Sequence, residues 1–251
     1  LLPVDEQIEN EFYRVGDNIK AYVINIRSRE TGVIVILSRT NPEFVKKLFE
    51  AEIPEIFGGQ LSVMKIVREP GIRTKIQIVA NDPKVDPISA CIGVKGTRID
   101  SIRRELHGEQ IDIVVFNDDS EQMIINALGV ESIKNVILER NRTVSVIVSE
   151  ADKVTAIGKQ GKNVKLAAKL TGLKIDIFTQ AEFDEKKAKE RRTVSHVTEL
   201  DGVTPKIAEI LRHAGYTSVQ DIFAASLEEL TNLEGLGQKT AERLKEASRY
   251  F

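Results

Sequence analysis

Two short glycine motifs are the residues of this chain whose types and spacing suggest chemistry. They are Gly93-Val94-Lys95-Gly96 and Gly158-Lys159-Gln160-Gly161. Each follows an isoleucine and precedes a predicted helix, another glycine and an Ile-Asp-Ile triplet. Glycines let a ligand approach the backbone because no Cβ is in the way, and a loop that opens a helix presents unpaired N–H groups to an anion. The repeat therefore predicts two equivalent sites for a phosphate backbone.

The elements around the motifs repeat as well. Hydrophobic patterns predict helix, two strands, helix, Gly-x-x-Gly, helix and strand over residues 41–117, and the same order over residues 118–180. Asn41 and the Asp118-Asp119 pair are expected to cap the first helix of each copy. The order α-β-β-α-α-β is that of the bacterial (type II) KH domain, which clamps about four nucleotides of a single strand. Single-stranded RNA is the predicted ligand.

Aliphatic, basic and polar side chains near the motifs are the candidate contacts. Ile92, Ile99, Ile157 and Val164 are expected to floor grooves for bases, since the aromatic content of 5% is too low for readout by ring stacking. One isolated Gly-x-x-Gly would more often be a plain turn, but two copies in register favour a binding function. The predicted RNA-binding residues are Gly93, Val94, Lys95, Gly96, Arg98, Gly158, Lys159, Gln160, Gly161, Lys162, Asn163, Lys165, Arg73 and Lys75.

The two motifs differ in charge. The net charge of the chain is only -2, so any site for a polyanion must be local. Residues 155–177 contain five lysines and one carboxylate, Asp176, whereas the first motif has Asp100 and Glu105 beside its arginines. We therefore expect the second loop to carry more of the salt-dependent affinity.

Composition excludes several classes of function. The 251 residues are 41% hydrophobic and 29% charged, which is typical of a folded soluble protein, and no run of about 18 apolar residues is present. His107, His196 and His213 are far apart and Cys91 is the only cysteine, so neither a metal site nor a disulfide is predicted. We expect no cofactor, no membrane contact, no enzymatic activity and a cytoplasmic location.

The segments outside the KH repeats predict different structures. Residues 1–40 contain strand patterns at 19–24 and 32–37, joined by the polar turn Ser28-Arg29-Glu30-Thr31. Two strands do not make a stable domain, so they are expected to be the second part of a β-barrel whose first strands lie upstream. Residues 181–193 are highly charged and predict a solvated helical linker.

A second repeat closes the chain over residues 194–251. Leu200-Asp201-Gly202 and Leu233-Glu234-Gly235 open two similar segments, which predict a pair of helix-hairpin-helix motifs joined by a helix near residues 219–224. This region has nine carboxylates and six Lys or Arg residues. Because an acidic surface binds polyanions poorly, protein contact is favoured over DNA contact, with plain structural packing the next choice.

Longer strings resemble the NusA family of bacterial transcription factors. Ile36-Leu37-Ser38-Arg39-Thr40 with Pro42-Glu43-Phe44-Val45 is similar to the junction between that family's OB-fold domain and first KH domain. Arg68-Glu69-Pro70-Gly71 and Asn81-Asp82-Pro83 resemble its first KH domain, and Ala167-Ala168-Lys169-Leu170-Thr171-Gly172 resembles its second. The resemblance implies a non-enzymatic RNA-binding factor that rides RNA polymerase and modulates pausing, termination and antitermination. It also implies polymerase contacts mainly through an N-terminal domain absent here, and protein partners for the helix-hairpin-helix region.

The predicted fold is a multidomain α+β protein with a partial OB-type β-barrel, two type II KH domains and an all-α tandem helix-hairpin-helix region. Its predicted divisions are residues 1–40, 41–117, 118–180, 181–193 and 194–251. The alternative function is a DNA-binding repair or recombination module that uses the helix-hairpin-helix pair. A ribosomal or ribosome-assembly KH protein is a third reading, which the paired KH domains and the acidic tail disfavour.

Overall fold

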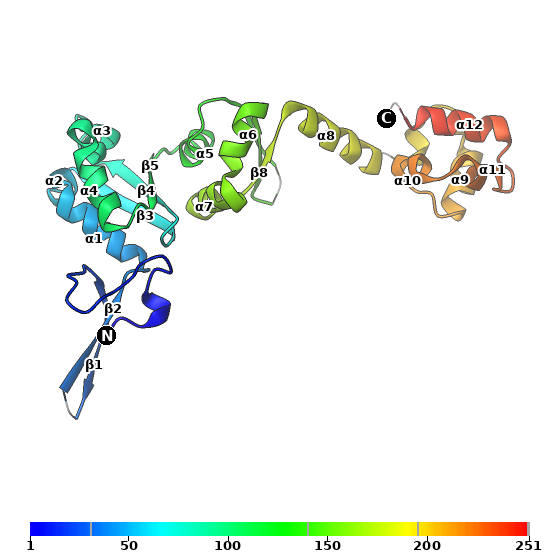
Figure 1. Cartoon of the computed structure of the whole chain (residues 1–251). Helices are drawn as coiled ribbons and strands as arrows, with labels where there is room; N and C mark the ends of the chain where they lie inside the picture. Colours follow the sequence, from blue (N-terminus) through cyan, green and yellow to red (C-terminus); the bar gives the residue numbers. More distant parts are fainter. Residues whose placement is uncertain (31, 140, 195, 250–251) are drawn as a thin grey trace. The chain divides into compact units, whose positions relative to one another are not determined.

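A computed structural model describes residues 1–30, 32–139, 141–194 and 196–249 (Figure 1). The chain divides into two compact units, Leu1–Ile177 and Phe178–Phe251. No helix among the described residues is long and apolar enough to cross a membrane. The predicted fold class is confirmed for the two KH domains and the C-terminal helical region.

The N-terminal segment forms a β-hairpin after a short 3-10 turn, Val4–Glu6. Strands β1 (Tyr22–Arg29) and β2 (Gly32–Ser38) are antiparallel and begin within three residues of the predicted positions. Among the described residues they pair only with each other, so no closed barrel forms there. Thr31 of the predicted turn lies outside the described residues.

Arg39 joins the hairpin to the first KH domain. Its side chain is buried, with Nε 2.5 Å from Oε2 of Glu11 and Nη1 3.0 Å from Oε1 of Glu105, and its guanidinium lies over the ring of Phe44. A buried charge is stabilising only when its partners satisfy it, and here carboxylates and carbonyls do so on every side. The loop before β1 is therefore held against α4.

The first KH domain follows the predicted order. Its elements are α1 (Pro42–Glu52), α2 (Pro54–Phe57), β3 (Leu61–Glu69), β4 (Arg73–Ala80), α3 (Pro87–Ile92), α4 (Thr97–Glu105) and β5 (Gln110–Val115). The sheet order is β3-β4-β5, with β3 antiparallel and β5 parallel to β4. Asn41 caps α1 as predicted, because its side chain accepts a hydrogen bond from the N–H of Glu43 at 2.9 Å.

Glu109, at the start of β5, fixes the turn between β3 and β4. Its fully buried carboxylate accepts hydrogen bonds from the guanidinium of Arg68, the N–H of Gly71 and the hydroxyl of Thr74. Charge-assisted bonds of this kind are stronger than neutral ones. They bring together the hairpin turn and the strand that follows the first Gly-x-x-Gly helix.

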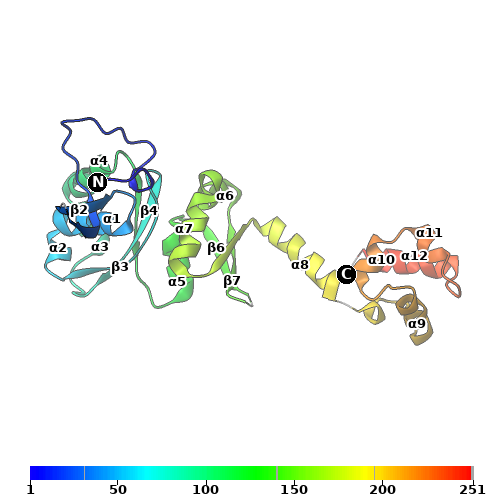
Figure 2. The same cartoon turned by 90° about the horizontal axis from the view of Figure 1, so that it is seen from below.

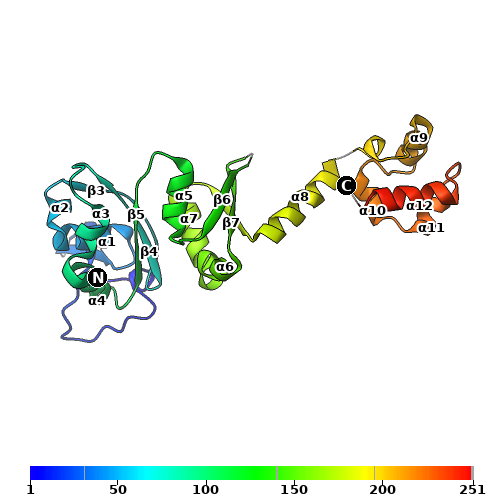
Figure 3. The ribbon, with the colours of Figure 1, turned by 90° about the horizontal axis from the view of Figure 1, so that it is seen from above.

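The second KH domain repeats this arrangement. Its elements are α5 (Ser120–Leu128), β6 (Ile133–Leu138), β7 (Thr143–Val148), α6 (Glu150–Ile157), α7 (Lys162–Thr171) and β8 (Lys174–Phe178), and its sheet order is β6-β7-β8. Asp119 caps α5 by accepting from the N–H groups of Glu121 and Gln122, as predicted. Figures 2 and 3 show α5 and α7 side by side along the sheet of β6 and β7.

The two KH domains share an interface on the sheet of the first. Side chains alternate along β4, so that Ile76 and Ile78 enter the core while Lys75 and Gln77 face the other side. That other side is covered by the second KH domain, since Nε2 of Gln77 contacts Sδ of Met123 on α5 at 3.4 Å. The interface explains why both faces of β4 are buried.

Each Gly-x-x-Gly helix is held at its C-terminus by a cation from the preceding part of the chain. Nη2 of Arg39 donates to the carbonyl of Glu105 on α4 at 2.8 Å, and Nζ of Lys65 donates to the carbonyl of Leu170 on α7 at 2.8 Å. Glu105 and Leu170 occupy the same position, nine residues after the last glycine of each motif. Unpaired carbonyls and the negative end of the helix dipole both favour a cation there.

The second unit is all-helical. Its helices are α8 (Gln180–Val194), α9 (Pro205–His213), α10 (Val219–Ala224), α11 (Leu227–Thr231) and α12 (Gln238–Ala247). Buried aliphatic residues such as Leu211, Ile222 and Leu244 form its core. Thr204 caps α9. Lys245 of α12 donates to the carbonyls of Ile222 and Phe223 in α10 and to that of Ala225, the residue after α10.

Replacing Lys65 by Met is expected to loosen the two KH domains from each other. The substitution keeps an apolar side chain of similar length and removes the cation at the end of α7, a contact of about 0.3–1 kcal/mol. We expect nitrogen-15 relaxation to show more independent tumbling of the two domains, with both still folded. Lys84→Met, at an exposed lysine in the loop before α3, serves as the control. Identical relaxation in the two variants would show that Lys65 does not hold the two domains together.

Candidate nucleic-acid interface

The two Gly-x-x-Gly loops have the same backbone path. Gly93 and Gly158 both have φ of 73°, with ψ of 174° and 167°, a conformation that only glycine adopts readily. Lys95 and Gln160, at the third position, are left-handed with φ of 54° and 55°. The last glycine of each motif is left-handed as well. The sequence repeat therefore corresponds to a repeated three-dimensional loop.

Arg98 holds the first loop in this shape. Its Nη1 donates to the carbonyl of Ala90 on α3 at 2.7 Å and pairs with Oε2 of Glu55 at 2.9 Å. A Cβ on Gly93 would lie 2.8 Å from Cγ of Arg98, so the first glycine is required for this side chain to cross over the loop. Arg98 ties α3 to α4 across the motif.

Asn163 does the same for the second loop. Like Arg98, it stands five residues after the first glycine of its motif. The Nδ2 of Asn163 donates to the carbonyls of Ala156 and Leu128, each at 3.0 Å. A Cβ added to Gly158 would lie 2.7 Å from the Cβ of Asn163. The side chain is buried, so its contribution to a predicted RNA contact would come through the shape of the loop.

The tips of both loops are exposed. Val94 is 81% exposed, and Lys95, Lys159 and Gln160 are also open to solvent. These are the two central residues of each motif. They lie where a phosphate backbone could approach the glycines without displacing any part of the protein.

A charge reversal distinguishes the two loops. Asp100 and Lys165 both stand four residues after the last glycine of their motif. Oδ2 of Asp100 lies 3.3 Å from the point where Gly96 would carry a Cβ, and Cε of Lys165 lies 3.6 Å from the same point on Gly161. A carboxylate therefore borders the first loop and an ammonium group the second. This difference is a physical basis for the predicted asymmetry in salt dependence.

An apolar groove of about 440 Å³ adjoins the first loop. Its lining residues are Ile88, Ile92, Gly96, Ile99, Asp100, Arg103, Ile111 and Ile113. The sequence predicts Ile92 and Ile99 as groove residues, but not Ile88, Arg103, Ile111 or Ile113. The alternating isoleucines at positions 111 and 113 are the sequence signal that identifies β5 as one wall of the groove. Ile88 is 44% and Ile92 38% exposed, which is high for isoleucine and leaves apolar surface for a base to cover.

Besides Arg98, three of the predicted basic contacts are engaged within the protein. Lys162 pairs with Glu69 on β3 at 3.6 Å. Nε of Arg73 lies 2.6 Å and Nζ of Lys75 2.7 Å from Oδ2 of Asp112. The Lys162–Glu69 pair and the group of Arg73, Lys75 and Asp112 lie at or beside the sheet face that the second KH domain covers. The side chain of Lys75 is only 1% exposed, so its position lends no support to a direct RNA contact.

Burial and pairing shift the pKa values in this cluster. Burial alone would raise the pKa of Asp112, but the hydrogen bond from Arg73 and the charge of Lys75 outweigh it, so the pKa is lowered. The pKa of Lys75 is lowered mainly by burial, against the attraction of Asp112. Asp112 therefore stays ionised and keeps both cations at the sheet.

Cys91 and the possible metal ligands of the described residues were the candidates for other chemistry. Cys91 is buried in the core of the first KH domain, as expected for a small packed residue, and burial raises the pKa of its thiol to about 12. Among the residues that the structure describes, no group of three or more His, Cys, Asp or Glu side chains could hold a metal ion.

Three family models match the chain. A NusA-like first KH domain matches residues 39–116, a NusA-like second KH domain matches residues 120–185, and a SAM-like helix-hairpin-helix tandem matches residues 194–249. These models cover the two loops and the C-terminal helices.

Curated relatives carry the name transcription termination/antitermination protein NusA. The one from Halalkalibacterium halodurans is 44% identical over 199 residues, which cover 79% of this chain and 52% of the relative. That from Bacillus subtilis is 43% identical over 186 residues, 74% of this chain and 50% of the relative. That from Rickettsia prowazekii is 34% identical over 256 residues, 100% of this chain and 51% of the relative. The chain thus spans about half the length of these relatives.

Gly158→Ala is expected to cost more stability than Gly161→Ala. At Gly158 an alanine is strained by about 1–3 kcal/mol and its Cβ would also meet Asn163. At Gly161 the backbone is left-handed and the nearest atom is Cε of Lys165 at 3.6 Å, so about 1–2 kcal/mol is expected. Urea denaturation of each variant measures the difference. The opposite ranking would show that Asn163 does not hold the loop.

Proposed function

The chain belongs to the NusA family of bacterial transcription proteins, and on this premise we propose that it binds single-stranded RNA through its two Gly-x-x-Gly loops. The observation that carries the proposal is the pair of loops with one backbone path, exposed tips and a common rigid support. We assign the binding to residues 41–117 and 118–180, each domain holding about four nucleotides.

The transcript of a bacterial RNA polymerase is the proposed source of this RNA. The relatives' name refers to transcription termination and antitermination. We propose that the chain, as part of such a factor, modulates pausing, termination and antitermination in the cytoplasm by binding and without catalysis. Contact with the polymerase is proposed to occur mainly through an N-terminal domain outside this chain.

A protein partner is proposed for the helix-hairpin-helix region. Lys245 is engaged with carbonyl groups at the end of α10, and Arg243 pairs with Asp201 at 3.5 Å. Arg212 also pairs with Glu209 at 4.0 Å, so at least three of the region's six cations have partners in the unit, which weakens the case for a DNA-binding surface. Titration of single-stranded RNA and duplex DNA, with and without residues 194–251, separates the two functions. Dominant duplex binding that is lost on truncation would favour the DNA-binding alternative.

Two double substitutions test the loops directly. Replacing Val94-Lys95 or Lys159-Gln160 by Asp-Asp should weaken RNA binding by about tenfold or more at low salt, because each adds negative charge at the phosphate path. Aspartate tolerates left-handed φ better than most residues, so the fold should persist at Lys95 and Gln160. Fluorescence anisotropy measures affinity and circular dichroism checks folding. Unchanged affinity in both variants would refute the proposal.

The charge reversal between the loops gives a paired prediction. Asp100→Asn should tighten RNA binding by about two- to fivefold, because a carboxylate no longer faces the phosphates, and Lys165→Asn should weaken it by a similar factor. Only the lysine variant should reduce the slope of log affinity against log salt, by about 0.7 for a single strand. Equal slopes in the wild type and Lys165→Asn would show that Lys165 does not contact phosphate.

A further inference from the structure

We propose that the outer side of α4 in the first KH domain is a second phosphate site, which binds nucleotides of the RNA strand beyond those in the apolar groove. The inference rests on the proposed function and extends it, because it assigns a longer RNA path to one of the two domains. It is carried by a hollow of about 490 Å³ that runs along α4 from the glycine loop toward β5.

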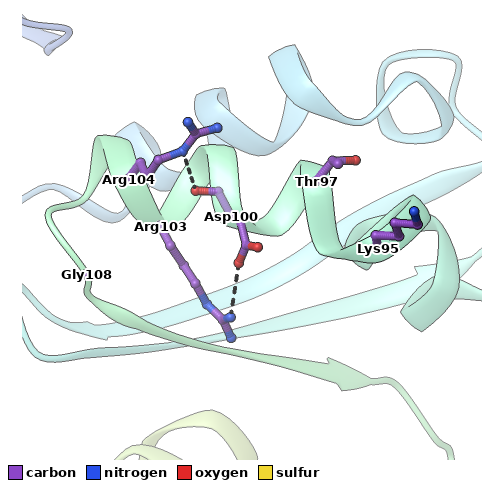
Figure 4. Close-up of a pocket in the computed structure, with 6 residues that line it drawn as sticks. All are labelled: Lys95, Thr97, Asp100, Arg103, Arg104 and Gly108. Carbon is purple, nitrogen blue, oxygen red and sulfur yellow. Dashed lines mark hydrogen bonds and ion pairs between the residues drawn. The ribbon is translucent and has the colours of Figure 1, made fainter.

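The hollow is lined by Lys95, Thr97, Asp100, Arg103, Arg104 and Gly108. Figure 4 shows Lys95 and Thr97 at the loop end of α4 and Gly108 at the other end, with Arg103 and Arg104 leaving the helix on different sides. The lining thus contains three cations and one carboxylate, and of these cations Arg103 alone is paired with the carboxylate. The lining differs from that of the groove, which contains five isoleucines, because the hollow has none. The lysine and the two arginines of the lining suit a phosphate group.

The cations of the hollow are held only weakly. Nη1 of Arg103 lies 3.5 Å from Oδ1 of Asp100, in a pair of exposed side chains three residues apart on the helix. Such surface pairs contribute little and are readily exchanged for another anion. Nε of Arg104 donates to the carbonyl of Asp100 at 3.3 Å, and within the described part of the chain Arg104 forms no ion pair. Its guanidinium can therefore take a phosphate without losing a carboxylate partner.

The hollow is continuous with the groove, because Asp100 and Arg103 line both. An RNA strand whose bases lie on the isoleucines of the groove would pass Arg103 where it leaves the groove, and then Arg104. The first loop would then place phosphates on two sides of α4. Lys95, at the loop tip, borders the hollow as well.

The equivalent helix of the second KH domain is partly engaged by the first domain. Lys162 and Lys169 of α7 correspond to Thr97 and Arg104 of α4 by their spacing from the last glycine. Lys162 is paired with Glu69 of the first domain, and the carbonyl of Lys169 accepts from Lys65. At the first of these two positions the second domain is engaged by the first, whereas Thr97 of α4 has no such neighbour among the described residues; Lys169, like Arg104, is exposed. The proposal is made for the first domain, where the hollow is found.

Arg104→Gln tests the site, because Arg104 lines the hollow and does not line the groove. The full chain is titrated with a single-stranded RNA of about 12 nucleotides and with one of about four, the length held by a single KH domain. We expect the variant to bind the longer RNA about three- to tenfold more weakly, with a salt slope lower by about 0.7, and the shorter RNA within about twofold of the wild type. Arg212→Gln is the matched control, since Arg212 is likewise an exposed arginine in the last turn of a helix, but in the second unit.

Three outcomes would overturn the inference. If Arg104→Gln loses the same affinity for both RNA lengths, Arg104 contacts the nucleotides in the groove. If it loses affinity for neither, the RNA does not occupy the hollow. Inorganic phosphate that shifts the Arg104 Nε resonance without competition from the longer RNA would indicate a free-anion site. Failure of the proposed function is distinct from all three, because the wild-type chain would then bind neither RNA.

Discussion

The arrangement of both Gly-x-x-Gly loops depends on cations that hold the ends of the helices behind them. The last carbonyls of a helix have no partner within the helix and carry the negative end of its dipole. Arg39 satisfies the carbonyl of Glu105 on α4, and Lys65 satisfies that of Leu170 on α7. In each case the cation comes from the preceding part of the chain. Because an α-helix is stiff over this length, fixing its C-terminus also fixes the glycine loop at its N-terminus.

The loops themselves show that one structural task can be done by unlike residues. An arginine in the first domain and an asparagine in the second both cross the first glycine of the motif and bond to the carbonyls of the preceding helix. This loop requires a hydrogen-bond donor five residues after the first glycine, and it requires that the first glycine carry no Cβ. Two positions further on, Asp100 in one domain and Lys165 in the other leave the backbone unchanged and alter the charge presented to a phosphate. Shape and electrostatics are thus set by different residues of the same helix.

Much of the fold follows from local patterns and was predictable. The strand predicted at residues 32–37 is β2 (Gly32–Ser38) and the helix predicted near residues 219–224 is α10 (Val219–Ala224), because apolar patterns and caps act over a few residues. The β-barrel expected for residues 1–40 is not seen among the described residues, since barrel closure depends on strands that a two-strand pattern does not supply. The division of the chain at residues 41, 118, 181 and 194 stays a prediction.

The sequence by itself determined the two loops, the order of elements around them and the chemistry of a phosphate backbone. It did so because glycine spacing, capping residues and hydrophobic periods act over a few residues. Only the tertiary structure decided which basic residues near the loops are open to a ligand. Lys75 and Lys162 are as basic in the sequence as Lys95 and Lys159, but the first two lie where one KH domain covers or borders the other. Exposure depends on neighbours far along the chain, which local sequence patterns do not show.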